Sequence, residues 1–324
     1  MSEDKRNNLS ILLVAFNRPN NARKVLEQIR KVKPSRFYYA IDGPRENNLE
    51  DQKNCKDCQS LLELVDWDCA VHTLFREKNV GCGFGPSQAI SWAFESTDRL
   101  IVLEDDCLPS LSFFSYCEEL LERYENDKRI GLISGLSIHS ESNYFGKYDY
   151  LFTRFSHTWG WATWKNRWEQ FDMYMRDFPM FSEEDVINSF FEKKTIRKYF
   201  MKRFSRIYNN IEEEVKHSWD SQWDYARLKN GWIDITPRLN LISNIGASDG
   251  THNSEGAEAS ALKTNDFQGC LNHPLFIINN TIYDNYHFSN YIHRPIFMQL
   301  IVFLSSKKGI KQMIEIIKRK FKKS

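Results

Sequence analysis

The sequence predicts an α/β fold, in the form of a doubly wound, mainly parallel sheet with helices on both of its faces. Short apolar runs typical of strands alternate with segments of helical pattern over the first 137 residues. The apolar runs are continuous rather than alternating, as expected for strands that helices cover on both sides. Ligands of such sheets bind at the carboxyl ends of the strands, so the residues at those ends are the most informative.

The first predicted strand is the apolar run "LSILLVAF" (residues 9–16), which ends in the polar sequence "NRPNN". A helix is predicted from about residue 21 to residue 33, because Val25 and Ile29 fall on one face and Pro34 ends the pattern. Together they form the first strand, loop and helix of the expected sheet.

The next strands follow the same plan. "RFYYAIDGP" (36–44) and "AVHTLFRE" (70–77) predict the second and third strands. The third leads into the glycine-rich "NVGCGFGPS" and then into a helix, "SQAISWAFEST". The fourth strand, "RLIVLEDD" (99–106), ends in three acids, and "DKRIGLISGLS" (127–137) predicts a fifth.

The second half of the chain has a different composition. It opens with the aromatic-rich "RFSHTWGWATWKNRWEQFD" and continues with a charged, helical pattern from about residue 180 to 216. A helix, "SWDSQWDYARLKNG" (218–231), is opened by Ser218, and "WIDITPRLNLI" predicts a further strand. Small residues then predict a flexible loop at 243–260.

The overall composition excludes several classes of function. The chain has 44 basic and 43 acidic residues and a net charge of +1, so it lacks the basic field that nucleic-acid binding requires. Its seven cysteines are scattered, and the single CxxC of Cys55 and Cys58 has no second pair, so neither a disulfide framework nor zinc is expected. We therefore expect a reducing compartment, and the N-terminus lacks an apolar signal sequence, which favours the cytoplasm.

The three acids after the fourth strand predict a cation site. Glu104, Asp105 and Asp106 repel one another unless a positive charge lies among them. Mg²⁺ or Mn²⁺ meets this need, because each binds one or two carboxylates together with phosphate oxygens and water. The alternative is a solvated acidic turn in which Glu104 or Asp105 caps the next helix.

Further residues at the strand ends suit a nucleotide. Asp42 is placed to accept a hydrogen bond from a base or ribose, and Arg18 to meet phosphate or base. The glycines after the third strand would let the backbone approach a diphosphate closely. The residues expected along this edge, besides the acids, are Asn17, Arg18, Asp42, Arg76, Gly81, Gly83 and Gly85.

Several of these motifs resemble a known family. "ILLVAFNRP", "AIDGPRE", "FREKNVGCGFGPSQAISWAF" and "LIVLEDDCLPSLSFFSYCEELL", followed by "WGWATW" and "SWDSQW", look like the GT-A glycosyltransferases. The chain is most similar to a bacterial family-2-like group, with similarity to the N-acetylglucosaminyltransferase I family. The resemblance covers residues 9 to 255 and implies a GT-A fold. It also implies transfer of a sugar from a nucleotide-diphosphate sugar, a UDP-sugar, to a glycan or glycoconjugate acceptor that is lipid-linked or protein-linked.

The resemblance implies roles for the donor-site residues. Asp106 would be the direct ligand of Mn²⁺ or Mg²⁺, with Asp105 and Glu104 contacting water or ribose. Arg18 and Asp42 would contact the nucleotide.

The resemblance also implies a catalytic base from the second half of the chain, as in inverting members of the family. The matching segment is "SWDSQWD", which leaves Asp220 and Asp224 as alternatives. From the residues alone, Asp220 is equally well explained as an acid at a helix N-terminus.

Two further features have open interpretations. His252, in "SDGTH", would close over the donor as a metal ligand or phosphate donor, or it is a solvated loop residue. Trp159, Trp161 and Trp164 would form a wall for the acceptor sugar, or they pack in the core beneath the site.

Two other classes of protein share some of these features. A sugar nucleotidyltransferase has the same α/β plan and metal, but it typically has a glycine-rich loop after its first strand, and "FNRPNN" contains no glycine. A non-catalytic carbohydrate-binding protein would explain the nine tryptophans but not the three acids.

The sequence predicts one catalytic domain and a tail. The domain would span residues 1–290, with a donor-nucleotide half at about 9–137 and an acceptor half at about 138–290. Residues 291–324 would form a basic amphipathic helical tail that either contacts an anionic membrane or docks on the catalytic domain. The apolar run "PIFMQLIVFL" is too short to span a bilayer, which needs about 20 residues.

Overall fold

The computed structural model describes residues 9–155, 157–246 and 262–293. The chain divides into two compact units, residues 1–279 and residues 280–324. This division lies before the predicted boundary between the catalytic domain and the tail.

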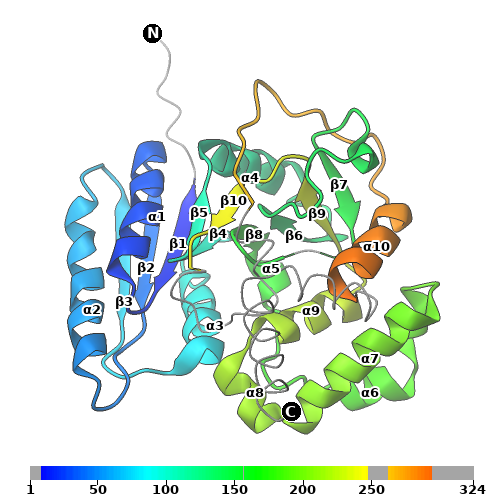
Figure 1. The fold of residues 1–324 in the computed structure, drawn as a ribbon, viewed down its shortest axis with the longest axis horizontal. Coiled ribbons are helices and arrows are strands. Elements are labelled where there is room, and N and C mark those ends of the chain that lie inside the picture. The colour runs from blue at the N-terminus through cyan, green and yellow to red at the C-terminus, as the bar shows by residue number, and fades with distance from the viewer. Residues whose placement is uncertain (1–8, 156, 247–261, 294–324) are drawn as a thin grey trace, which may run out of the picture. The chain divides into compact units, whose positions relative to one another are not determined.

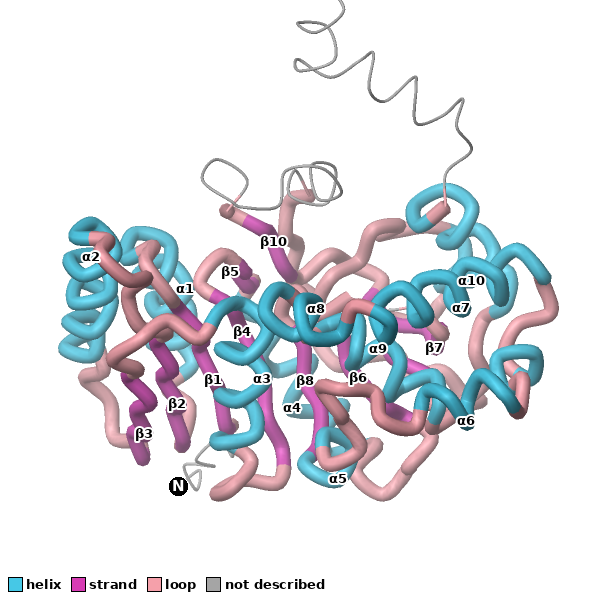
Figure 2. Tube along the Cα trace, turned by 90° about the horizontal axis from the view of Figure 1, so that it is seen from below, coloured by secondary structure: helices cyan, strands magenta, loops and turns pink. Residues whose placement is uncertain are grey.

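The first unit is built on an eight-stranded sheet (Figure 1). Its strands are β1 (Ser10–Ala15), β2 (Arg36–Ile41), β3 (Ala70–Phe75), β4 (Arg99–Glu104), β6 (Ile130–Ser134), β7 (Tyr150–Thr153), β8 (Trp161–Trp164) and β9 (Ile233–Pro237). Across the sheet they follow the order β3-β2-β1-β4-β8-β6-β9-β7, and the view from below shows β3, β2, β1, β4, β8 and β6 side by side (Figure 2). The pairs β1–β2, β2–β3, β1–β4 and β6–β9 are parallel, whereas β8 and β7 run antiparallel to their neighbours.

Helices cover both faces of this sheet, so the predicted α/β class is confirmed. Those of the first unit are α1 (Pro19–Val32), α2 (Leu49–Ser60), α3 (Gly81–Ala93), α4 (Leu111–Arg123), α5 (Lys165–Trp168), α6 (Phe178–Glu183), α7 (Lys194–Asn209), α8 (Ile211–His217) and α9 (Asp220–Lys229). Three short 3₁₀ turns, η1 (Leu61–Leu64), η2 (Asn143–Phe145) and η3 (Val186–Ser189), lie between them.

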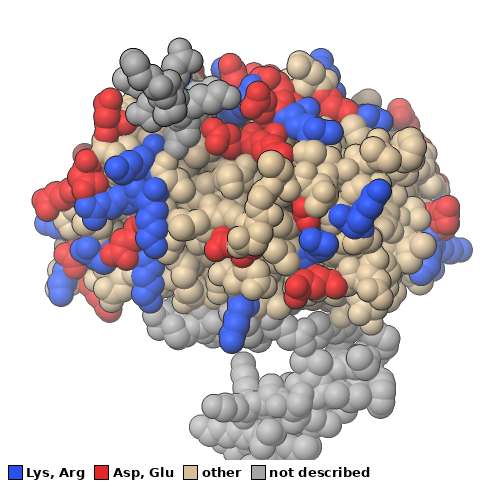
Figure 3. Space-filling model, turned by 90° about the horizontal axis from the view of Figure 1, so that it is seen from above, with Lys and Arg blue, Asp and Glu red and all other residues tan. Residues whose placement is uncertain are grey.

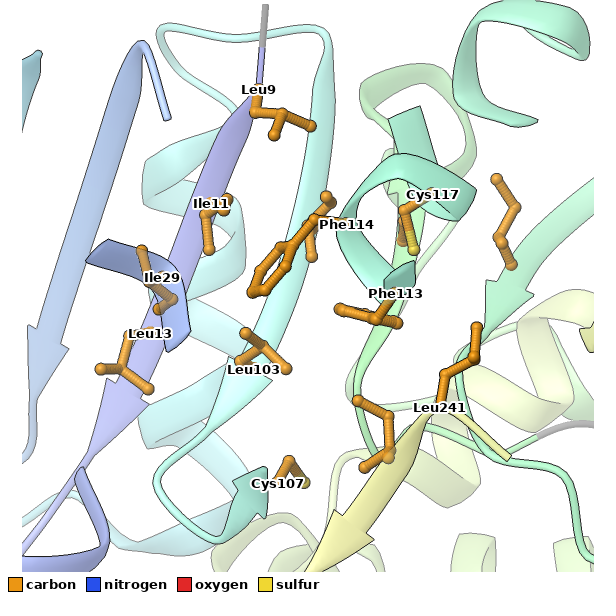
Figure 4. Close-up of a cluster of buried hydrophobic side chains, with 14 of the residues drawn as sticks. Leu9, Ile11, Leu13, Ile29, Leu103, Cys107, Phe113, Phe114, Cys117 and Leu241 are labelled. Atoms are coloured by element: carbon orange, nitrogen blue, oxygen red, sulfur yellow. The ribbon is translucent and has the colours of Figure 1, made fainter. Parts of the chain in front are cut away.

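Two hydrophobic cores lie against opposite faces of the sheet, because successive strand side chains point to opposite sides. On one face, Leu13 of β1 belongs to the same cluster as Ile29 of α1 and Phe113 of α4 (Figure 4). On the other face, Leu12 of β1 belongs to a cluster with Ile90 of α3. The continuous apolar runs of the central strands are therefore explained by burial on both sides.

The sequence analysis missed β5 (Cys107–Pro109), β7 and β8, and it merged β9 with β10 (Ile242–Asn244). β5 and β10 form a separate two-stranded antiparallel sheet in which Asn244 pairs with Cys107. This small sheet lies beside the end of β4 (Figure 1). It therefore brings the residues after β10 close to the three acids, which a single long strand would not do.

The second unit contains α10 (Thr281–His287) and the π-helical turn η5 (Phe288–Ile292). The side chain of Asn280 caps α10 by accepting a hydrogen bond from the backbone N–H of Tyr283 at 3.0 Å. Within the described ranges, no helix combines the length and apolarity needed to cross a membrane.

The charged side chains show the same balance as the composition. On the face drawn in Figure 3, acidic and basic side chains are interspersed, and neither sign forms a continuous surface there. This distribution agrees with the net charge of +1.

Candidate active site

The acidic turn, Glu104, Asp105 and Asp106, follows β4 in the middle of the sheet. β4 pairs in parallel with β1, so the turn lies next to the loop that joins β1 to α1. The structure therefore brings together Arg18 and the three acids, as the sequence predicted for one edge of the sheet. The three carboxylates, however, do not face one common point.

Asp105 is an internal ion-pair partner. Its carboxylate is only 2% exposed, and it accepts hydrogen bonds from the Arg18 guanidinium and, at 3.3 Å, from the Phe16 backbone N–H. Burial raises the pKa of Asp105, while the positive charge of Arg18 opposes this rise. The expected contact of Asp105 with ribose or water is not available in this arrangement, because both of its oxygens are engaged inside the protein.

Asp106 is more accessible. Nη1 of Arg18 donates to Oδ2 of Asp106 at 3.0 Å, and the Asp106 side chain is 18% exposed. The backbone N–H of Ile245, just after β10, donates to the Asp106 carbonyl at 2.8 Å. A Cβ on Gly246 would lie 2.6 Å from Asp106 Oδ2, so only glycine lets the chain pass this close to the carboxylate.

Alternation along β4 places Glu104 on the same face of the sheet as Val102, which belongs to the cluster with Ile90 of α3. Its carboxylate accepts no hydrogen bond from the described residues. Burial raises the pKa of Glu104, and the negative charges of Asp106, Asp105 and Asp220 raise it further, against the opposing charge of Arg18. Glu104 and Asp220 also both raise the pKa of the Cys82 thiol, after the larger effect of burial. Glu104 therefore lies within electrostatic reach of the candidate base Asp220.

The two candidate bases, Asp220 and Asp224, have different surroundings. Asp220 is the exposed first residue of α9, and its Oδ1 accepts a hydrogen bond from the Ser218 hydroxyl at 2.5 Å. Asp224 instead accepts from Arg203 Nη1 at 2.9 Å and from the Arg227 guanidinium. Two guanidinium groups thus hold Asp224, whereas Asp220 is exposed and its carboxylate accepts from one hydroxyl.

Asp42, expected to contact the nucleotide, organises the loop that opens α3. Its Oδ1 accepts from the N–H groups of Gly43 at 2.9 Å and Val80 at 3.1 Å. Its Oδ2 accepts from Asn79 Nδ2 at 2.9 Å and the Gly81 N–H at 3.2 Å. Both oxygens are thus occupied within the chain, and burial raises the pKa of Asp42.

The space beside Gly81 and Gly83 is filled by protein rather than left open for a diphosphate. A Cβ on Gly83 would lie 1.9 Å from the Val215 carbonyl oxygen, and one on Gly81 would lie 2.8 Å from that of Lys216. These carbonyls belong to α8. The glycines therefore admit α8 against α3, and α8 leads directly to Asp220 at the start of α9.

The remaining predicted nucleotide contacts also have partners within the chain. Arg76 donates to Gln88 Oε1 at 3.1 Å, and burial lowers the pKa of its guanidinium. Asn17 Nδ2 donates to Asp51 Oδ1 at 2.7 Å. Asp51 and its ion-pair partner Arg45 were missed by the sequence analysis. The Asn48–Asp51 spacing predicts a helix start, since Asn48 caps α2, but no pattern shows that Asp51 points inward.

Two of the three tryptophans expected to form an acceptor wall are core residues. Trp161 and Trp164 are the first and last residues of β8 and point to opposite faces of the sheet, and both are buried, one in each core. The Trp161 ring packs 5.7 Å from that of Trp219 and 5.9 Å from that of Trp223. Their burial leaves no ring face for a sugar, so the packing alternative is correct for them. Trp159 is half-buried against the core.

No group of three or more His, Cys, Asp or Glu side chains is arranged to hold a metal ion within the described part of the chain. His252 and most of the expected loop at 243–260 lie outside the described residues.

No family model matches the chain, and no curated protein matches it. Three solved structures that it resembles are transferases. The mannosyltransferase PcManGT from Pyrobaculum calidifontis, in complex with GDP-Man and Mn²⁺, has a TM-score of 0.35 and 11% identity over 49% of this chain and 45% of its own. Mouse xyloside xylosyltransferase 1 has a TM-score of 0.32 and 12% identity, over 68% of this chain and 81% of its own.

The third is 4-diphosphocytidyl-2C-methyl-D-erythritol synthase from Anaerococcus prevotii, with a TM-score of 0.31 and 10% identity over 55% of this chain and 79% of its own. The chain thus matches less than half the length of the mannosyltransferase. With identities of 10 to 12% and TM-scores of 0.31 to 0.35, none of these likenesses assigns an activity to this chain.

Proposed function

We propose that this protein is a metal-dependent, inverting glycosyltransferase of the GT-A type that moves a sugar from a UDP-sugar to a glycan or glycoconjugate. One observation carries the proposal: the acidic turn at the end of β4 lies beside Arg18 and within electrostatic reach of Asp220 on α9. Donor-binding groups and a free carboxylate base are the two requirements of such a transfer. The motifs shared with GT-A glycosyltransferases add to this support.

Asp106 is the residue that would hold Mn²⁺ or Mg²⁺. Apart from the weak thiol donor of Cys107 at 3.5 Å, Asp106 Oδ1 accepts no hydrogen bond from the described residues. One carboxylate fits a hard divalent cation that completes its shell with diphosphate oxygens and water. Such a cation would neutralise the charge that develops on the leaving diphosphate.

The side chains of the chain itself would perform the remaining steps. Arg18, held by Asp105 and Asp106, adds a fixed positive charge for the leaving diphosphate. Asp220 takes the proton of the acceptor hydroxyl as that oxygen attacks the anomeric carbon. The bond from the anomeric carbon to the diphosphate oxygen breaks on the opposite side, so the anomeric configuration is inverted.

Burial of the tryptophans argues against the binding-protein alternative. A carbohydrate-binding protein needs exposed aromatic faces, but Trp161, Trp164, Trp168, Trp219 and Trp223 are buried. Binding of a neutral sugar also does not require three adjacent carboxylates, whereas binding of a divalent cation requires at least one.

Incubation with a panel of UDP-sugars and Mn²⁺ tests the proposal. A glycosyltransferase releases UDP slowly by donor hydrolysis and faster when an acceptor is present. Exchange of labelled pyrophosphate into a nucleotide sugar would instead identify a nucleotidyltransferase. Absence of both reactions across the panel, with Mg²⁺ as well as Mn²⁺, would contradict an enzymatic function for this site.

We further propose a setting at the cytoplasmic side of a bacterial membrane, in the synthesis of surface polysaccharide or glycoconjugates. The support is the family resemblance and the basic amphipathic pattern of residues 305–324. An enzyme that extends a lipid-linked glycan would find its acceptor at that surface.

A further inference from the structure

The loop between β1 and α1 is held by acids on both of its sides. The Phe16 N–H donates to Asp105, and Arg18 pairs with Asp105 and Asp106 after β4. Asn17 lies between Phe16 and Arg18 in the sequence, and its Nδ2 donates to a different acid, to Asp51 Oδ1 at 2.7 Å. The acidic turn thus fixes one side of this loop, and Asp51 fixes the other.

Asp51 is a buried anion surrounded by donors. It is 1% exposed and sits in the first turn of α2, where its own N–H donates to Asn48 Oδ1 at 3.0 Å. Besides Asn17, it accepts from Arg45 Nε at 2.6 Å, Nη2 at 2.9 Å and the backbone N–H at 3.2 Å. The bonds from Arg45 are the main cause that lowers the pKa of Asp51 to about 2, so the acid stays charged at neutral pH.

The two side chains that Asp51 holds both have polar atoms left for a ligand. The Arg45 side chain is 57% exposed, and its guanidinium carbon lies 5.6 Å from the centre of the Phe16 ring. With Nε and Nη2 tied to Asp51, Nη1 of Arg45 makes no hydrogen bond to the described residues. Asn17 uses its amide nitrogen for Asp51, and its Oδ1 accepts no hydrogen bond within the described part of the chain.

The sheet order indicates which part of a nucleotide these groups would meet. β1 lies between β2 and β4 (Figure 2). The loops that follow β2 and β4, which carry Arg45 and Asp106, therefore lie on opposite sides of the β1 loop. A diphosphate bound at Asp106 would therefore extend its nucleoside over the β1 loop towards Arg45 and Asn17. These residues offer a cation, an aromatic ring and an amide oxygen, which suit a base and ribose.

We propose that Asp51 is a positioning residue of the nucleotide site, which holds Asn17 and Arg45 so that they face the nucleoside of the donor. The inference rests on the proposed function. Asp51 itself touches no ligand, because both of its oxygens are occupied. Its removal frees the Arg45 side chain to rotate and leaves the Asn17 amide without its partner, so the nucleoside loses two ordered contacts.

A purely structural role for Asp51, as the anchor of α2, predicts a different result. Loss of an anchor would lower the stability of the fold and reduce the affinity for every ligand of the site by a similar factor. Loss of a positioning residue weakens the nucleoside contacts and leaves the diphosphate contacts intact. The comparison of UDP with pyrophosphate therefore separates the two roles.

Asp66 offers a matched control. Its carboxylate accepts two hydrogen bonds from the side chain of Arg30, as that of Asp51 does from the side chain of Arg45. Both Asp66 and Arg30 are exposed, however, and Asp66 does not contact the β1 loop. Asp66→Asn thus removes the same kind of ion pair without changing the proposed site.

The experiment is calorimetric titration of the full-length protein with UDP and with pyrophosphate, each with Mn²⁺. Asp51→Asn should weaken UDP binding about tenfold, the lower range seen when an outer partner of a bound group is removed. Pyrophosphate affinity should stay unchanged, and Asp66→Asn should bind both ligands as the wild type does. Undiminished UDP affinity in Asp51→Asn, or an equal loss for UDP and pyrophosphate, would overturn the proposal.

Arg45→Met provides a second variant if Asp51→Asn does not fold, since the Arg45 side chain lies largely at the surface. It should show the same selective loss of UDP affinity, and normal UDP binding by this variant would also overturn the proposal. A wild-type protein that binds another nucleoside diphosphate instead of UDP contradicts only the choice of UDP, and the variants are then compared with that ligand. A wild-type protein that binds none of them contradicts the proposed function and this inference together.

Discussion

Arg18 gives the acidic turn a positive charge of its own. It pairs with Asp105 and Asp106, so two of the three adjacent carboxylates are compensated by the protein itself. The repulsion that led us to expect a metal ion is therefore partly relieved without one. A divalent cation at Asp106 would share this carboxylate with Arg18, and Asp106 is the residue on which its binding should depend.

Replacement of Asp106 by alanine should abolish metal-dependent UDP binding, because the diphosphate charge loses its main compensation. Calorimetry with UDP and Mn²⁺ measures this. Asp66→Ala, which removes an exposed acid paired with Arg30, should leave the affinity unchanged. Equal metal-dependent UDP affinity of the Asp106 variant and the wild type would show that Asp106 does not hold the metal.

Asp220→Asn should retain UDP affinity but lose transfer by about 10²-fold or more, since a general base typically contributes that much. Asp224→Asn should instead lower the melting temperature, because it breaks the pairs with Arg203 and Arg227. Steady-state transfer rates and thermal unfolding of the two variants provide the comparison. The assignment is wrong if Asp224→Asn loses transfer at normal stability while Asp220→Asn remains active.

Gln222 is completely buried in α9, and neither atom of its amide has a hydrogen-bond partner in the described part of the chain. A buried amide without partners destabilises the fold by about 1 to 3 kcal/mol. Gln222→Met, which keeps the length of the side chain, should therefore raise Tm by about 2 to 6 °C. Gln52→Met, at an exposed position of α2, should leave Tm unchanged. A lower Tm for Gln222→Met would show that the amide is hydrogen-bonded in solution.

At the scale of elements, the contact between α3 and α8 assembles the site. α8 can approach α3 only because Gly83 has no side chain, and its position determines where α9 and Asp220 begin. The glycine run therefore admits α8, which leads to Asp220, the base of the proposed transfer, and leaves no space for a phosphate beside Gly83. The sequence predicted that "GCGFG" would lie against a diphosphate, whereas in the structure it lies against α8.

Gly83→Ala should lower both Tm and the transfer rate, because its Cβ would overlap the Val215 carbonyl oxygen. The transfer rate should fall more than UDP affinity, since α8 and α9 are displaced from the acidic turn. Gly85→Ala is the matched control in the same helix, where the nearest atom to a Cβ is Asp42 Oδ2 at 3.5 Å, an ordinary contact. The same loss in both variants would attribute the effect to α3 alone.

The sequence predicted the strands of the first half because most of them are apolar runs that end in polar residues. β1, β2, β3, β4 and β6 all fall within the expected segments. The short antiparallel strands β7 and β8 were missed because four residues are too few to show a period. The sequence also leaves open whether the tryptophans of β8 form a ligand wall or a core, since composition does not reveal the face to which a side chain points.

The candidate site was predicted in part. The sequence placed the acids and Arg18 at one edge because parallel strands end together. It did not reveal that the Asp42 carboxylate accepts hydrogen bonds from the loop at 79–81, or that Asp51 points inward. Both features depend on tertiary contacts. Nor did it reveal that Asp224 pairs with two arginines, because those contacts also depend on the tertiary structure.

At the scale of the whole chain, the tail at 305–324 gives a testable link to the membrane. Ile310, Ile314 and Ile317 fall on one face of a predicted helix whose other positions are rich in lysine. The intact protein should sediment with anionic liposomes, and less at high salt, because each basic residue contributes about 1 kcal/mol near such a surface. A chain ending at Ser305 should not sediment. Equal sedimentation of both proteins, or of neither, would favour a tail that docks on the catalytic domain.

The order of the strands has a consequence for synthesis of the chain. β8 lies between β4 and β6, although both of these are made before it. Until residues 161–164 leave the ribosome, β4 therefore exposes an unpaired hydrogen-bonding edge, and β6 has no neighbour at all, since β9 follows later still. Unpaired edges of apolar strands invite aggregation. The nascent chain thus passes through a vulnerable stage in which insertion of β8 joins β4 to β6, while the other edge of β6 stays unpaired until β9 is made.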